Sequence, residues 1–161
     1  MKKIIIQFII VSLSTLTIIF TFSSCHKEPQ PDQHYNLDVS LRGGKSFGFI
    51  KFTQDPDPAK IIILYTWVRG LKPNHEYLLQ RAVDAANMVD NNCSSTSWLT
   101  LGKGLIPQSI LTDDKGNGEE ELWRDVTAIP SGAKFDIHFQ IIDAATMGVV
   151  LTSDCYWYQV R

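Results

Sequence analysis

Hydrophobic and polar residues alternate with a period of two along much of the chain after residue 36. The clearest case is 135–141, where Phe, Ile, Phe and Ile alternate with Asp136, His138 and Gln140. Successive side chains of a strand point to opposite faces. The pattern therefore predicts a half-buried strand with one wet face, as in an antiparallel sheet.

Short strand-like runs of this kind recur along the chain and are separated by turn residues. The predicted strands are 37–41, 47–52, 60–69, 75–83, 98–101, 106–111, 119–126, 135–142, 149–152 and 156–160. The run 60–69 is apolar on both faces. Only 81–90 has a helix-like composition. Asn87 and the polar residues 90–92 would end such a helix after a few turns at most. Tight hairpin turns are expected at 42–45 and 117–118. Many short strands predict an all-β domain, a sandwich or a barrel.

The first residues form a separate segment. Two lysines are followed by an uncharged apolar run from Ile4 to Phe22, and then by Ser23, Ser24 and Cys25. This arrangement is typical of a secretory signal. It resembles the lipobox of bacterial lipoproteins, although Phe22 stands where that family prefers Leu. The resemblance implies cleavage before Cys25, a diacylglyceryl group on its sulfur, and a further acyl chain such as palmitate on the new amino group.

These features divide the chain into a signal peptide (1–24), a lipidated Cys and tether (25–35), and one domain (36–161). The alternative is an uncleaved membrane anchor, because the apolar run approaches the roughly 20 residues that span a bilayer. In the lipoprotein family an Asp after the Cys retains the protein at the inner membrane. Here that residue is His26, which implies an outer-membrane lipoprotein on the periplasmic or surface face.

The expected mature chain keeps 13 basic and 17 acidic side chains, a net charge of −4. A nucleic-acid partner is not expected, because such proteins carry a basic patch or stripe. The expected partners are the membrane, through the lipid anchor, and a glycan or protein ligand.

The stretch 70–79 (GLKPNHEYLL) resembles the tyrosine corner of fibronectin type III and related immunoglobulin-like domains. In those domains a Leu-x-Pro loop is followed by a Tyr whose hydroxyl bonds back to the loop backbone. Pro73 and Tyr77 occupy these positions. The resemblance implies an antiparallel Greek-key β-sandwich of immunoglobulin-like type. About 80 residues follow the corner, more than a standard module has.

The same stretch, together with 111–118, is similar to the copper–zinc superoxide dismutase sandwich. That enzyme needs more histidine ligands than His75 and His138, the two in the domain, so this activity is excluded. Calcium is a weak alternative in the loop that carries Asp113, Asp114, Asn117 and Glu119, because calcium takes several oxygen ligands. A plain hairpin is the favoured interpretation. No cofactor and no catalytic set is predicted.

Four tryptophans are many for one domain. Trp67, Trp98, Trp123 and Trp157 would fill the core in most sandwiches, whereas an exposed cluster would form a ligand platform. Trp157 is the candidate for a platform, with Tyr156 and Tyr158, because its two neighbours point to the opposite face of the last strand.

Lipidation of Cys25 would leave two cysteines in an oxidising compartment, an even number. We therefore expect a disulfide between Cys93, in a polar loop, and Cys155, at the last strand.

The function expected from these features is that of a non-catalytic binding or adhesion module. A structural or assembly lipoprotein of the envelope is the alternative, and a hydrolase is less favoured.

Overall fold

The computed structural model describes residues 33–161. The predicted signal peptide, Cys25 and most of the tether lie outside the described residues. Within 33–161, no helix has the length and apolar character needed to cross a membrane.

The described chain contains one 3-10 turn, η2 (Gln33–Tyr35), and otherwise strands, which confirms the all-β class. The strands are β1 (Asn36–Gly43), β2 (Ser46–Gln54), β3 (Ile61–Arg69), β4 (Glu76–Val83), β5 (Leu99–Thr100), β6 (Gly102–Lys103), β7 (Ile106–Pro107), β8 (Ser109–Leu111), β9 (Gly118–Asp125), β10 (Lys134–Asp143), β11 (Val149–Ser153) and β12 (Tyr156–Gln159). The predicted strand positions agree closely with these bounds except between 102 and 111. There β6 was not predicted, and the predicted strand 106–111 is divided into β7 and β8. The helix-like run 81–90 instead ends β4 and begins a loop.

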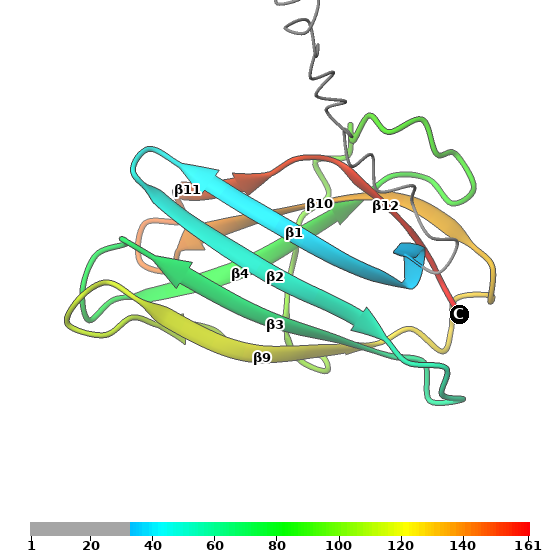
Figure 1. Ribbon diagram of the computed structural model, residues 1–161, viewed down its shortest axis with the longest axis horizontal. Coiled ribbons are helices and arrows are strands. Elements are labelled where there is room, and N and C mark those ends of the chain that lie inside the picture. The colour runs from blue at the N-terminus through cyan, green and yellow to red at the C-terminus, as the bar shows by residue number, and fades with distance from the viewer. Residues whose placement is uncertain (1–32) are drawn as a thin grey trace, which may run out of the picture.

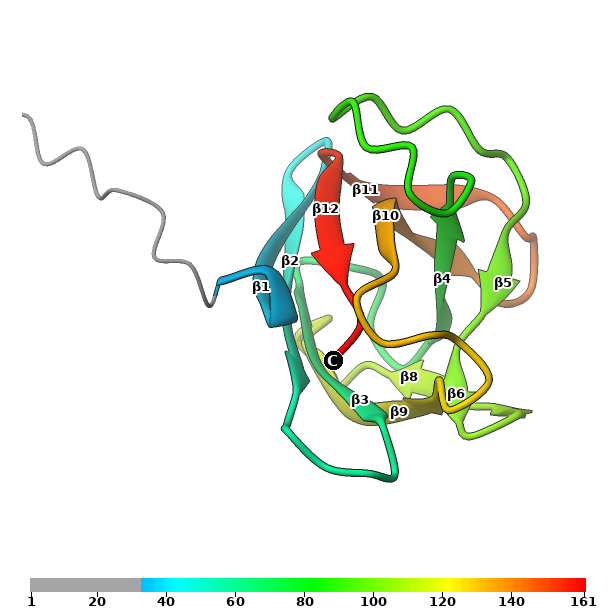
Figure 2. The ribbon, with the colours of Figure 1, turned by 90° about the vertical axis from the view of Figure 1, so that its right-hand side faces the viewer.

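The strands form one sheet in the order β5-β4-β10-β11-β1-β2-β3-β9-β6-β7. Its two ends meet, because only Leu101 separates β5 on β4 from β6 on β9. Strand β8 pairs with β4, and a bridge joins Thr112 to Gly118 at the start of β9. The sheet is therefore a nearly closed barrel (Figures 1 and 2).

The two-sheet sandwich of immunoglobulin-like type is not confirmed, because the strands form one nearly closed sheet. In an immunoglobulin domain the strands are divided between two packed sheets. Here β2 and β3 pair along their whole length, from Phe47↔Arg69 to Gln54↔Ile62. The reason is that a tyrosine corner fixes one loop and one strand end, and leaves the pairing of distant strands open.

The core fills the barrel with side chains from alternate positions of each strand. It includes Val39 and Leu41 of β1, Ile50 and Phe52 of β2, Leu64 of β3, Leu79 of β4, Leu122 of β9 and Phe139 of β10. Strand β3 shows that composition alone does not determine which side chains face the core. Its inward positions include Thr66, which is 1% exposed, whereas its aromatic residues point outward.

The predicted wet face of β10 is also corrected. The period of two is present, but Asp136 and Gln140 are buried on the side away from the core. The loop 84–98 covers this side: Asp90 and Asn91 donate backbone N–H groups to Asp136 Oδ2 at 2.8 and 3.0 Å. The strand is thus covered on both faces, by the core and by the loop.

Candidate ligand-binding face

The outer surface of β2, β3 and β9 carries a continuous band of large apolar side chains. We call this band the aromatic face; it consists of Phe47, Phe49, Ile63, Tyr65, Trp67 and Trp123. The three strands lie side by side at the front of the barrel in Figure 1. Phe47 is 59% exposed, Tyr65 44% and Trp123 37%. Large contiguous patches of exposed apolar side chains mark interaction sites.

Strand register fixes how these rings meet. Phe49 lies directly across from Trp67, and their ring centroids are 5.9 Å apart. Tyr65 and Trp67, on the same side of β3, have centroids 6.1 Å apart and planes inclined by only 23°. Ile63 follows on β3 and pairs with Trp123 of β9. The rings therefore lie beside one another on the outer side of paired strands.

Charged groups alternate with the rings across this surface. On β9, Glu119 lies opposite Trp67 and Glu121 opposite Tyr65. On the β2 side, Lys51 lies opposite Tyr65. A hydrogen bond to Glu121 raises the pKa of the Tyr65 hydroxyl, and the negative charge of that carboxylate raises it further. The face thus offers aromatic stacking beside both hydrogen-bond acceptors and donors.

The expected core packing of the tryptophans is wrong. Trp67, Trp98 and Trp157 are only partly buried, Trp123 is exposed, and none belongs to the core cluster. The sequence did hold a signal for the aromatic face, because the segment 60–69 is apolar on both faces. In a barrel only one of those faces can be inside.

The structure distributes the three residues of the predicted platform over two sides of β12. Tyr158 is buried, and its hydroxyl donates to Gln54 Oε1 at 2.7 Å. The Tyr156 hydroxyl accepts the backbone N–H of Ser40. Trp157 points the other way, and the ring of His34 stacks on it at a centroid distance of 3.2 Å. The three rings therefore do not present one exposed surface.

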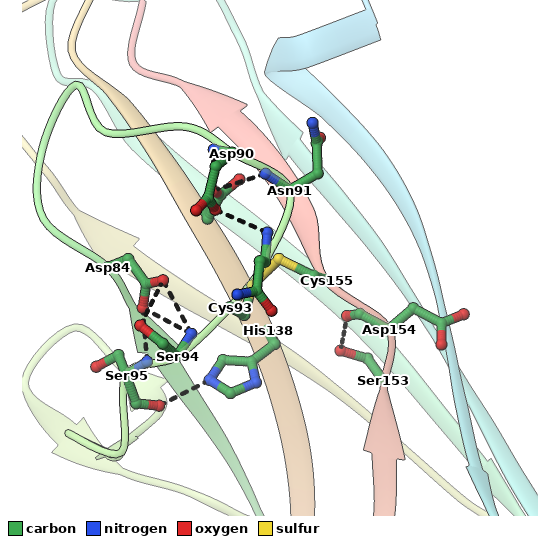
Figure 3. Close-up of a disulfide and its surroundings, with 12 residues drawn as sticks. Asp84, Asp90, Asn91, Cys93, Ser94, Ser95, His138, Ser153, Asp154 and Cys155 are labelled. Carbon is green, nitrogen blue, oxygen red and sulfur yellow. Dashed lines mark hydrogen bonds between the residues drawn. A yellow bond between two sulfur atoms is a disulfide. The ribbon is translucent and has the colours of Figure 1, made fainter.

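The disulfide between Cys93 and Cys155 is confirmed, with a Cα–Cα distance of 5.4 Å (Figure 3). It ties the loop 84–98 to the start of β12. The same loop is held by Asp84, whose carboxylate accepts backbone N–H groups of Ser94 and Ser95. The bond from the Ser94 N–H is the main reason that the pKa of Asp84 is lowered. His138 contacts the Ser95 carbonyl through Nε2 at 3.0 Å.

Tyr77 has the contact that the tyrosine-corner pattern predicts. The ring is 1% exposed, and its hydroxyl accepts the backbone N–H of Lys72 at 3.0 Å. Pro73 follows Lys72 in the exposed loop between β3 and β4. Beside the ring, His75 Nε2 lies 2.9 Å from Asp143 Oδ2, and Lys72 Nζ lies 3.3 Å from the same oxygen. The two domain histidines, His75 and His138, thus have separate local partners.

The loop that carried the weak calcium alternative is a hairpin between β8 and β9. The Asp113 carboxylate accepts the backbone N–H groups of Lys115 and Asn117 at 2.9 and 2.8 Å. The residue with positive φ is Gly116, so the turn lies before the expected Asn117–Gly118 pair. Asp114 is exposed at this turn, and Glu119 is exposed on β9. Within residues 33–161, no cluster of three His, Cys, Asp or Glu side chains could hold a metal ion.

Comparison with known proteins adds no assignment: no protein family, curated protein or solved structure matches this chain.

Proposed function

We propose that this chain is a membrane-anchored, extracytoplasmic lipoprotein whose domain is a non-catalytic glycan-binding module. In this proposal Cys25 carries the lipid at the outer membrane, on its periplasmic or surface side. Residues 26–35 hold the domain away from the bilayer. The aromatic face binds the ligand.

The observation that carries the proposal is the interleaving of rings and charged groups on the aromatic face. Aromatic rings have an electron-rich face that packs well on the C–H groups of a sugar ring. The carboxylates of Glu119 and Glu121 accept hydrogen bonds from sugar hydroxyls, and Lys51 donates them. The core of a protein–protein interface is instead depleted of charged residues. A surface that mixes rings with charged groups suits an extended polar ligand.

The strand order also supports a Greek-key arrangement, the finer part of the expected fold. Strands β4, β8 and β9 follow each other around the barrel, and β10 then returns to pair with β4. This is the Greek-key order of four strands. The aromatic face, on β2, β3 and β9, and the loop 84–98, which covers Asp136 of β10, lie on different walls of the barrel.

A glycan array together with a pull-down tests the proposal, using the domain without its signal and lipid. We expect Trp67→Ala and Tyr65→Ala each to weaken glycan binding about tenfold or more, as central aromatic contacts do. Trp157→Ala, on β12 and stacked on His34, is the matched control and should bind like wild type.

Loss of binding in Trp157→Ala but not in Trp67→Ala would place the ligand site elsewhere. If no glycan on the array is bound and a protein is recovered in the pull-down, the structural or assembly role is favoured.

A further inference from the structure

Two arginines point into the barrel. Arg81 follows Tyr77 and Leu79 at inward positions of β4, and Arg124 follows Leu122 at the next inward position of β9. Both lie near the end of the barrel that holds the C-terminus, where the segment 126–133 crosses the opening (Figure 2). The two strands that carry them are linked there by the segment 99–104.

Between these arginines and the segment 126–133 lies a cavity of about 60 Å³. Its other lining residues are apolar or aromatic, among them Phe52, Phe135, Phe139 and Tyr158. Since one water needs roughly 10–15 Å³ of such space, the cavity has room for about four to six groups of that size. Ile129, from the segment 126–133, also lines it.

Neither guanidinium is neutralised within the described part of the chain. The ion pairs there join Arg42, Lys72, His75 and Lys103 to carboxylates, and none includes Arg81 or Arg124. Arg124 donates one hydrogen bond, from Nη1 to the Gly104 carbonyl at 3.2 Å. Burial lowers the pKa of Arg81, and the positive charge of Arg124 lowers it further.

Two arginines of like charge inside the barrel, unpaired within the described residues, lower the stability of the folded domain. Both arginine side chains are partly buried. A charge that loses part of its hydration is stabilised by an opposite charge nearby, and a second charge of the same sign destabilises it. An anion between the two guanidinium groups would relieve both costs, because Arg binds a carboxylate through two parallel hydrogen bonds. The apolar lining next to it would favour an anion that also carries a hydrocarbon group.

We propose that this cavity binds a small monocarboxylate, with the carboxylate held between Arg81 and Arg124 and a short apolar tail inside the barrel. The volume restricts the tail to about four to six carbon atoms. A longer tail has to displace Ile129 and the segment that carries it. This site is separate from the aromatic face and does not depend on the proposed glycan binding.

Isovalerate titrated calorimetrically into the purified protein tests the proposal, with isovaleramide as a neutral match of the same shape. We expect the acid to bind and the amide to bind at least about tenfold more weakly. Sodium chloride at the same concentration should give no comparable heat.

Arg81→Met and Arg124→Met should each weaken isovalerate binding about tenfold or more. Arg69→Met, which removes an outward-facing arginine of β3, and Trp67→Ala should leave it unchanged. Because each Met replaces an uncompensated charge, neither inward variant should melt at a lower temperature than wild type. Thermal unfolding monitored by circular dichroism separates this result from a loss of folding.

The proposal is overturned if isovalerate gives no binding at a concentration of about 10 mM. Equal affinity for the amide, or unchanged affinity in both Met variants, would overturn it as well. Lower melting temperatures in both Met variants, with isovalerate and isovaleramide indistinguishable on wild type, would identify the two arginines as structural.

Discussion

His75 and Asp143 approach each other to 2.9 Å across the end of the barrel, between Nε2 and Oδ2. His75 begins the run into β4, and Asp143 ends β10. The Asp143 side chain is only 4% exposed. Its other oxygen accepts the backbone N–H groups of Ala145 and Thr146, both at 3.0 Å. This single carboxylate therefore joins the corner loop to the β10–β11 turn.

Asp143 should make stability fall in acid. The hydrogen bond from His75 is the main cause that lowers its pKa in the folded state, well below the ordinary value of 3.8. The stabilisation is therefore present above about pH 4 and is lost as the pH falls below that value. Urea unfolding from pH 6 to pH 3 should show a shallower decline for Asp143→Asn than for wild type. Asp114→Asn, in the exposed hairpin, is the control; parallel curves for wild type and Asp143→Asn would contradict this account.

Tyr77→Phe should lower the free energy of unfolding by about 1–3 kcal/mol. The substitution removes only the hydroxyl and leaves the backbone N–H of Lys72 without its acceptor. Chemical denaturation measures the change, and Tyr65→Phe on the exposed face is the matched control. A loss below about 0.5 kcal/mol would mean that the hydroxyl does not stabilise the corner.

The disulfide should contribute up to about 4 kcal/mol, the value of the chain-entropy model for a closed loop of this length. The double substitution Cys93→Ser with Cys155→Ser tests it by chemical denaturation. The loop amides of Asp90 and Asn91 should also exchange with deuterium faster, because the bond holds them near Asp136. Mass spectrometry of unreduced, alkylated protein exported to the periplasm provides the direct check: two alkylated thiols would show that the bond is absent.

Cys25→Ser should abolish lipid attachment and leave an uncleaved or mislocalised precursor. The serine hydroxyl cannot replace the thiol as the site of the diacylglyceryl group that the lipobox resemblance implies. Metabolic labelling with a fatty acid compares the variant with wild type. Cys93→Ser is the control and should incorporate the labelled fatty acid like wild type. Equal labelling of the Cys25→Ser variant would reject the lipid anchor.

Local signals predicted much of the described chain. Strand positions followed from alternation and turn residues, and the 42–45 hairpin has Gly44 with positive φ between Gly43 and Ser46, which pair. The disulfide followed from an even cysteine count after lipidation. The contact of Tyr77 with the loop backbone followed from a ten-residue motif. Each of these predictions depends on residues that are close in sequence or on the number of cysteines.

The sequence did not reveal which face of each strand packs into the core. On β3 both faces are apolar, so alternation separates the two faces but cannot say which is inside. The barrel buries Thr66 and leaves Tyr65 outside because closure places the even positions toward the core.

The covering of Asp136 by the loop 84–98, and the placement of Arg81 and Arg124 around one cavity, have the same origin. Each brings together segments some 40 residues apart or more. Only the tertiary structure decided these features, because pairing between distant strands is set by the packing of the whole core rather than by local preference. The sequence by itself determined the strands, the hairpin at 42–45 and the disulfide; the closure of the sheet determined the aromatic face and the cavity.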